Sequence, residues 1–196
     1  MALLSGGQAA VEALKAEKTD FVFGLIGSAT MEMFDALYDA QDIKLIGVHD
    51  ERTGTHMADG YARASGKTGV ILAGQNGPGT TNLVTGLAQA KAAYTPLVSI
   101  GGALSFEHLY RDAFQEVDQQ ALFTPITKKT WTATSSERVP EMMREAFRVA
   151  NAPRKGPVQL NLPRNVLSGQ AEFAAMQAPS DYRPVSLQAA PESSIN

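Results

Sequence analysis

The side chains with the most obvious chemical potential lie where an apolar segment ends, at Glu51 and its neighbours. Residues 43–48 are mostly apolar, and His49, Asp50 and Glu51 follow them directly. Acidic side chains at the carboxyl end of a buried strand occupy the place where open α/β sheets bind their ligands. Alternatively, Glu51 only caps the helix that follows, since the helix dipole favours a negative charge there. The residues alone leave both interpretations open.

A glycine-rich segment, Gln75-Asn76-Gly77-Pro78-Gly79, is the second candidate. It follows the apolar residues 70–73 and precedes a helical pattern, so it could place backbone N–H groups around an anion. It lacks the Gly-Lys-Ser/Thr ending of a P-loop and the glycine spacing of a dinucleotide-binding turn. A plain tight turn explains the segment equally well. A nucleotide or phosphate binder is therefore only an alternative function.

The histidines and the adjacent carboxylates exclude two other kinds of site. His49, His56 and His108 do not form the closely spaced pairs that bind metal, so we expect no metal site. Asp50 and Glu51 are neighbours, and on a regular strand they would point to opposite faces. A paired-carboxylate glycosidase site is therefore not expected here.

The elements that must position these residues follow an alternating pattern. Six short apolar runs alternate with helical patterns; they cover residues 20–26, 43–48, 70–73, 96–100, 129–133 and 157–162. This alternation predicts an α/β fold, with a doubly wound, mostly parallel six-stranded sheet and helices on both faces.

Local signals predict how some of the helices begin. Ser5 and Gln8 have the spacing of a capping box at the start of the first helix. Ser28 is expected to cap the second helix. Residues 112–123 are expected to form a short helix that buries three apolar side chains, those of Phe114, Val117 and Ala121.

Composition narrows the class of protein. The 196 residues carry a net charge of −3, and 44% of them are hydrophobic, which fits one soluble domain. No basic stretch suggests nucleic acid, and no apolar run approaches the ~18 residues of a membrane span. The absence of cysteine fits a cytoplasmic protein. The regular pattern covers residues 1–168, and 169–196 are expected to be a linker or tail.

Three motifs, taken in order, resemble one enzyme family. They are Glu51 with His56-Met57-Ala58-Asp59-Gly60-Tyr61-Ala62-Arg63, then Asn76-Gly77-Pro78-Gly79 with Asn82, then Phe114-Gln115-Glu116. This series resembles the N-terminal pyrimidine-binding domain of thiamine-diphosphate enzymes, and more narrowly the acetolactate synthase large subunit. The resemblance covers roughly residues 3 to 168.

The resemblance implies that Glu51 is the catalytic glutamate. Its carboxyl would hydrogen-bond a ring nitrogen of the aminopyrimidine of thiamine diphosphate. That bond favours the imino tautomer, whose nitrogen removes the proton from the thiazolium carbon. Gln115 matches a second catalytic position, and like Phe114 it would face the reacting centre. The donor substrate would be a 2-oxo acid such as pyruvate, from which a two-carbon acyl unit is transferred.

The same resemblance assigns residues to the cofactor itself. Besides Glu51 and Phe114, the positions expected to bind it are Leu25, Ile26, Gly27, Gln75, Pro78 and Asn82. Two departures stand out: Asp50 replaces a usual histidine, and Ile26-Gly27-Ser28 replaces the common Pro-Gly-Gly. The segment Gln75-Asn76-Gly77-Pro78-Gly79 is similar to that of sulfoacetaldehyde acetyltransferase, which is an alternative activity.

The family's diphosphate-binding motif, Gly-Asp-Gly, does not occur in this sequence. Mg²⁺ and the diphosphate would therefore belong to an absent domain, and residues 169–196 would lead towards the family's middle domain. We expect an inactive N-terminal fragment or, alternatively, a pyrimidine-binding subunit of a two-subunit 2-oxo acid decarboxylase. The resemblance implies a homodimer or homotetramer and leaves FAD binding open. A non-catalytic dimerisation or regulatory module is the interpretation from a different class.

Overall fold

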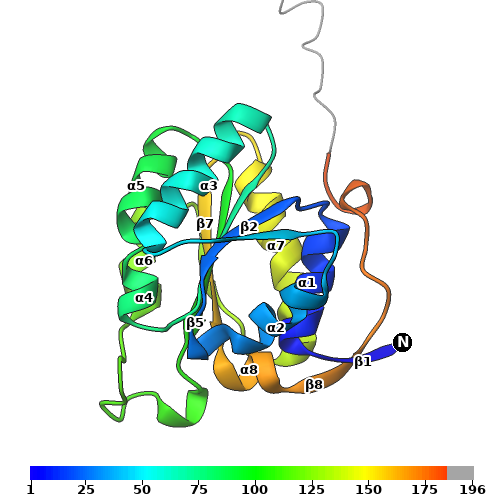
Figure 1. Ribbon diagram of the computed structural model, residues 1–196, viewed down its shortest axis with the longest axis vertical. Coiled ribbons are helices and arrows are strands. Elements are labelled where there is room, and N and C mark those ends of the chain that lie inside the picture. Colours follow the sequence, from blue (N-terminus) through cyan, green and yellow to red (C-terminus); the bar gives the residue numbers. More distant parts are fainter. Residues whose placement is uncertain (185–196) are drawn as a thin grey trace, which may run out of the picture.

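The computed structural model describes residues 1–184 and contains a six-stranded, all-parallel sheet (Figure 1). In spatial order its strands are β3 (Lys44–Gly47), β2 (Phe21–Leu25), β4 (Gly69–Ala73), β5 (Leu97–Ala103), β7 (Pro157–Pro163) and β6 (Thr130–Thr132). Each of the six predicted apolar runs overlaps one of these strands, and β4, β5 and β7 extend beyond the predicted bounds. The predicted doubly wound α/β fold is confirmed.

The point where the chain reverses its direction of travel across the sheet lies between β2 and β4. From β2 the chain moves outward to β3 and then returns to β4 on the other side of β2. In the paired register Leu25 lies opposite Ala73, so both strands end at the same edge. Ligands of open α/β sheets bind in the crevice at such a point.

Helices cover both faces of the sheet (Figure 1). One layer consists of α1 (Gly6–Ala16), α2 (Met31–Asp39), α7 (Val139–Asn151) and α8 (Arg164–Ser168), and the other of α3 (Glu51–Ser65), α4 (Pro78–Thr81), α5 (Val84–Ala92) and α6 (Gln119–Phe123). A hydrophobic core lies on each face of the sheet, and alternate residues of β4 belong to one or the other. Val70 and Leu72 pack on the α1 side, and Ile71 and Ala73 pack on the α3 side. All four are fully buried, as expected for a strand that is covered on both faces.

The two predicted helix starts have different outcomes. The capping box is confirmed, because the Gln8 N–H donates to Ser5 Oγ at 3.1 Å and the Ser5 N–H donates to Gln8 Oε1 at 2.9 Å. The prediction that Ser28 caps the second helix is wrong. Ser28 begins a 3₁₀ turn, Ser28–Thr30, and α2 starts at Met31 without a side-chain cap. The Ser28 hydroxyl is engaged elsewhere, with Gln75.

The predicted helix over residues 112–123 is also wrong for most of its length. Only Gln119–Phe123 is helical, and the Phe114 side chain is 80% exposed. Val117 and Ala121 are exposed as well. The reason is local, since the Glu116 carboxylate accepts the N–H groups of Tyr110 and Ala113 and so closes an irregular loop.

A small antiparallel pair joins the two ends of the described chain. β1 (Ala2–Ser5) pairs with β8 (Gln170–Phe173), and Phe173 is buried against the domain. The prediction that no folded element follows Gly169 is therefore wrong for residues 170–173. Residues 185–196 of the predicted linker lie outside the described residues.

The remaining short elements are the 3₁₀ turns Phe106–His108, Thr124–Ile126, Ser136–Arg138 and Pro179–Asp181. Within residues 1–184 no helix combines the length and the apolar character that crossing a membrane requires.

Candidate functional site

Glu51 is the first residue of α3, and its neighbour caps that helix. Asp50 has an extended backbone, and its Oδ1 accepts the Thr53 N–H at 3.1 Å. This is the standard arrangement at a helix N-terminus, where a short acidic side chain accepts a free N–H group. The interpretation of Glu51 as the cap is therefore wrong. With Asp50 in that role, the Glu51 carboxyl is available for another contact.

The Glu51 carboxyl is buried between α3 and the turn that follows β4. The residue is 5% exposed, and its Oε2 accepts a hydrogen bond from Asn82 Nδ2 at 3.0 Å. A Cβ atom at Gly79 would lie 3.0 Å from Oε1, so the absence of a side chain there leaves space beside this oxygen. Among the described residues Oε1 accepts no hydrogen bond, yet it is not one of the unpaired atoms sealed from solvent. One carboxylate oxygen is thus fixed and the other is accessible.

Backbone contacts explain the glycines around this turn. A Cβ atom at Gly74 would lie 2.1 Å from the backbone nitrogen of Gly27, so the ends of β2 and β4 approach too closely for side chains. Gly77 has a φ of +54°, and a Cβ atom there would lie 2.2 Å from the carbonyl oxygen of Gln115. Glycine is the residue that tolerates both conditions. The turn is therefore packed directly against the loop that carries Gln115.

A chain of amide hydrogen bonds crosses the sheet edge from Ser28 to Gln115. The Ser28 backbone N–H and hydroxyl both donate to Gln75 Oε1, at 3.1 and 2.9 Å. Since a backbone N–H can only donate, the Gln75 amide has one orientation, with its Nε2 donating to Gln115 Oε1 at 2.5 Å. The Nε2 group of Gln115 therefore remains available as a donor.

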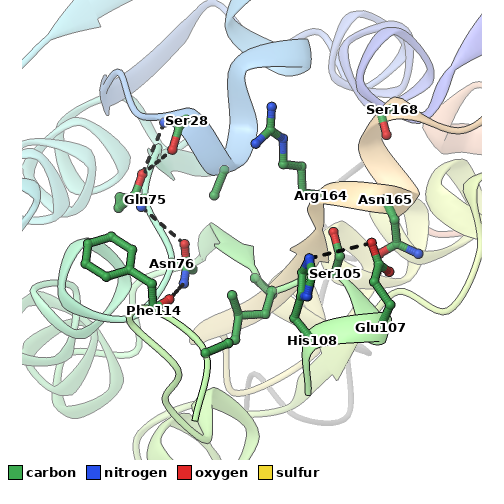
Figure 2. Close-up of a pocket in the computed structure, with 14 residues that line it drawn as sticks. Ser28, Gln75, Asn76, Ser105, Glu107, His108, Phe114, Arg164, Asn165 and Ser168 are labelled. Atoms are coloured by element: carbon green, nitrogen blue, oxygen red, sulfur yellow. Dashed lines mark hydrogen bonds and ion pairs between the residues drawn. The ribbon is translucent and has the colours of Figure 1, made fainter. Parts of the chain in front are cut away.

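Asn76 holds the loop that carries Gln115 in place. Its Nδ2 donates to the carbonyl oxygen of Gln115 at 3.1 Å. It also donates to the carbonyl oxygen of Phe114 at 3.4 Å (Figure 2). Gln115 has a φ of +62°, an uncommon conformation for a residue other than glycine. Sequence reasoning placed Asn76 in a motif but gave it no role. The only signal in the sequence was an amide residue inside a glycine-rich turn; its burial and its contacts with the loop that carries Gln115 appear only in the structure.

The structure brings most of the predicted site residues to one edge of the sheet. Glu51, Asn82, Gln75 and Gln115 lie around Gly79 and the amide chain, and Pro78 begins α4 beside them. The predicted segment at the end of β2 is also at this edge; its Leu25 is half-buried, its Ile26 is 65% exposed and its Gly27 contacts the turn. Phe114 projects from the loop with its ring exposed.

An open cavity of about 630 Å³ adjoins the amide chain (Figure 2). Ser28, Gln75, Asn76 and Phe114 line one side of it, and residues from the segment after β5 and from α8 line the other. Arg164 is the cavity residue that sequence reasoning missed, because an isolated arginine after a strand belongs to no motif. In residues 1–184 no group of three or more His, Cys, Asp or Glu side chains is arranged to hold a metal ion.

The fold and the site define a class of protein. The family model described as "Thiamine pyrophosphate enzyme, N-terminal TPP binding domain" matches residues 4–122, which is more than half of the chain. The chain belongs to this family.

Individual relatives narrow the comparison. The chain is 40% identical over 177 residues to the probable acetolactate synthase large subunit of Methanocaldococcus jannaschii, a match that covers 90% of this chain and 30% of the relative. It is 37% identical over 184 residues to the acetolactate synthase of Mycobacterium bovis, covering 92% of this chain and 29% of the relative. It is 36% identical over 173 residues to the acetolactate synthase large subunit of Haemophilus influenzae, a match that covers 88% of this chain and 30% of the relative. The chain thus spans about 30% of the length of these relatives.

Proposed function

We propose that this chain is the cofactor-activating domain of an acetolactate-synthase-like enzyme, which transfers a two-carbon acyl unit from a 2-oxo acid such as pyruvate. Its membership of the thiamine pyrophosphate family supports the cofactor, and its acetolactate synthase relatives support the activity. The single observation that carries the proposal is the Glu51 carboxyl, buried at the sheet edge with one oxygen held by Asn82 and the other accessible.

The residues fit the pyrimidine end of thiamine diphosphate. A flat nitrogen heterocycle needs a carboxyl group that can reach a ring nitrogen and a wall without side chains against which to lie. Glu51 provides the first, and Gly79 provides the second. When bound, the cofactor supplies an acidic thiazolium carbon that becomes the nucleophile towards the 2-oxo acid.

The roles of the chain's own residues follow from their contacts. Glu51 would hold a proton between Oε1 and the ring nitrogen, while the Asn82 amide keeps the carboxyl group oriented through Oε2. The free N–H groups of Gln115 would donate to an oxygen of the reacting substrate, since Gln75 occupies its Oε1. The protein therefore orients groups and moves a proton, and the carbon chemistry belongs to the cofactor.

The diphosphate would be held elsewhere, by a domain that is continuous with this chain or by a separate subunit. Mg²⁺ and, where the synthase is a flavoprotein, FAD would belong to that part of the enzyme. The exposed Ile26 and Phe114 side chains at the site edge favour a dimer in which a second protomer completes the site. A cytoplasmic location accords with a chain that has no cysteine. The sulfoacetaldehyde, decarboxylase-subunit and non-catalytic alternatives have no comparable support.

Reconstitution with the diphosphate-binding part tests this proposal. The change is Glu51→Gln, and the measurement is pyruvate consumption by the completed enzyme. We expect the rate to fall by about 10² to 10⁴-fold, the contribution of a positioned acid–base group. Glu172→Gln on β8 is the matched control, because that side chain is exposed and lies on the separate β1–β8 pair, and its rate should be unchanged. Full activity of the Glu51→Gln variant would refute the proposal.

A further inference from the structure

The cavity beside the amide chain contains a cation that nothing in the described chain neutralises. Arg164 is the first residue of α8, directly after β7, and its side chain extends towards the segment that carries Ser28 (Figure 2). Within residues 1–184 its guanidinium group takes part in no ion pair, which is also true of Arg111, Arg144 and Arg154, but Arg164 is the arginine that lines this cavity. Arg164 therefore presents its charge to the cavity.

The other groups around Arg164 are mostly donors or are already satisfied. The Phe106 backbone N–H donates to Asn165 Oδ1 at 3.3 Å, so the Asn165 Nδ2 group is left to donate. Glu107 supplies the one carboxylate among the lining residues, and it lies 4.0 Å from His108 with its side chain 60% exposed. Water therefore screens much of the Glu107 charge, and it also screens part of the charge of Arg164, which is an exposed residue at the rim of this open cavity. The cavity favours a ligand with several acceptor oxygens and a negative charge.

We propose that Arg164 binds the carboxylate of the 2-oxo acid substrate, in a subsite that also contains the Asn165 amide. A guanidinium group matches a carboxylate with two parallel hydrogen bonds, which fixes the orientation of the acid as well as its position. The cavity's volume of about 630 Å³ is ample for a three-carbon acid. It is also continuous with Gln75, whose side chain lies beside Gly79 next to Glu51.

In this arrangement two groups at the carboxyl edge of the sheet, Arg164 and the amide chain, would each bind one end of the 2-oxo acid. The negative end of the acid would lie at Arg164, and its carbonyl end would be directed towards the amide chain from Ser28 to Gln115. The identity of the acid rests on the proposed function, whereas the requirement for a carboxylate rests on the cavity itself. An acid would be selected over an aldehyde or a ketone of similar size, because these would leave the guanidinium charge unpaired.

A titration of the 196-residue chain tests the subsite without any cofactor. The probes are pyruvate and methyl pyruvate, which keeps the carbonyl group but replaces the charged carboxylate with an ester. Binding is followed by the backbone amide resonances of residues 104–108 and 164–168. We expect saturable shifts with pyruvate and an affinity for methyl pyruvate that is lower by about 10- to 100-fold, the range for hydrogen bonds to a charged group.

Matched variants identify the residue responsible. Arg164→Gln should lower the pyruvate affinity by about 10- to 100-fold. Arg164→Lys keeps the charge but lacks the two parallel N–H donors of the guanidinium group, and it should lower the affinity less. Arg154→Gln makes the same change on an exposed arginine that contacts Tyr94, and it should leave the affinity unchanged. The proposal is overturned if pyruvate gives no saturable shifts, if methyl pyruvate binds equally well, or if Arg164→Gln binds pyruvate like the unaltered chain.

The same titration separates this proposal from the proposed function. Glu51→Gln should leave the pyruvate affinity unchanged, because Glu51 does not line the cavity. If the reconstituted Glu51→Gln enzyme were fully active while Arg164→Gln lost pyruvate affinity, the role of Glu51 would be refuted and the carboxylate subsite would stand. The reverse pair of results would leave the role of Glu51 intact and refute the subsite.

Discussion

Two buried glutamates lie at opposite edges of the same sheet, and their surroundings differ. Glu51 is at the carboxyl edge, where its partner is the neutral Asn82 amide. Glu17 follows α1 at the amino edge, where its side chain is 1% exposed and is paired with Arg183. Glu17 Oε1 is sealed without a hydrogen-bond partner among the described residues, whereas Glu51 Oε1 is accessible.

The difference separates a structural carboxyl group from a functional one. Burial raises the pKa of Glu17 from 4.5 to about 7, even though the Arg183 guanidinium lowers it in part. Glu17 therefore holds the segment around Arg183 against the domain, and its side chain is almost fully buried in that contact. One Glu51 oxygen accepts a hydrogen bond from a neutral amide, and the other accepts none among the described residues. A carboxyl group with one such available oxygen can exchange a proton with a bound heterocycle. Three predictions test this contrast.

The largest effect is expected at the amino edge. Arg183→Met leaves the buried Glu17 carboxylate without its cation, so the free energy of unfolding should fall by about 3 kcal/mol at pH 8. Chemical denaturation measures this loss. Arg154→Met, on an exposed arginine, is the control and should cost little. Activity of the completed enzyme under conditions where the variant is folded should be unchanged, and a loss of activity without a loss of stability would contradict the contrast.

The pH dependence of that loss has a defined sign. Because the folded-state pKa of Glu17 lies above its unfolded value, its contribution to stability is complete below pH 4.5 and is lost as the pH rises through about 7. Removing Arg183 raises the folded pKa further, so the variant should approach the unaltered chain at acidic pH and diverge from it above pH 7. Adding Glu17→Gln to Arg183→Met removes the titrating group, and this divergence should disappear.

The second prediction concerns Gly79, at the carboxyl edge. In Gly79→Ala the new methyl group would lie 3.0 Å from Glu51 Oε1 and 2.8 Å from Gln75 Cβ, so one of these groups must move. A misplacement of this size should lower the activity of the completed enzyme by about 100-fold. Gly60→Ala on α3 is the matched control, since its Cβ atom would meet nothing within 4 Å. The control should keep its activity and gain about 0.5–1 kcal/mol of stability. Equal activities in the two variants would refute the role given to the space at Gly79.

The smallest effect is expected for Ser28→Ala. The variant loses the hydroxyl bond to Gln75 Oε1 but keeps the bond from the backbone N–H, so the Gln75 amide retains its orientation. The expected cost is about 1 kcal/mol, which corresponds to a fewfold loss of activity in the completed enzyme. Ser180→Ala, near the amino edge, is the control. A loss as large as that of Gly79→Ala would mean that the hydroxyl, rather than the backbone, orients the amide chain.

Much of this fold could be predicted from the sequence because its signals are local. The apolar runs at residues 20–26 and 70–73 are nearly or fully continuous, and the others are short segments in which apolar residues recur; the Ser5–Gln8 capping box spans a single turn. The position of Glu51 at a strand-to-helix junction follows from the same kind of signal. Its burial and its contact with Asn82 depend on where α4 packs, and no local pattern gives that.

The features that the sequence did not reveal depend on contacts between distant residues. β1 and β8 are four residues each and pair across almost the whole described chain, so neither is recognisable alone. Phe114 has the spacing of a buried helical residue, but the Glu116 carboxylate and the Asn76 amide hold its segment in a loop. The interest of Arg164 lies in the cavity that it lines together with residues from distant segments.

The most direct test of the account is the rate at which the completed enzyme exchanges the thiazolium proton of thiamine diphosphate for deuterium, followed by NMR without substrate. If the accessible oxygen of Glu51 promotes that proton transfer, Glu51→Gln should slow the exchange by about 10² to 10⁴-fold while Arg164→Gln leaves it unchanged. An exchange rate in the Glu51→Gln enzyme equal to that of the unaltered enzyme would contradict the account.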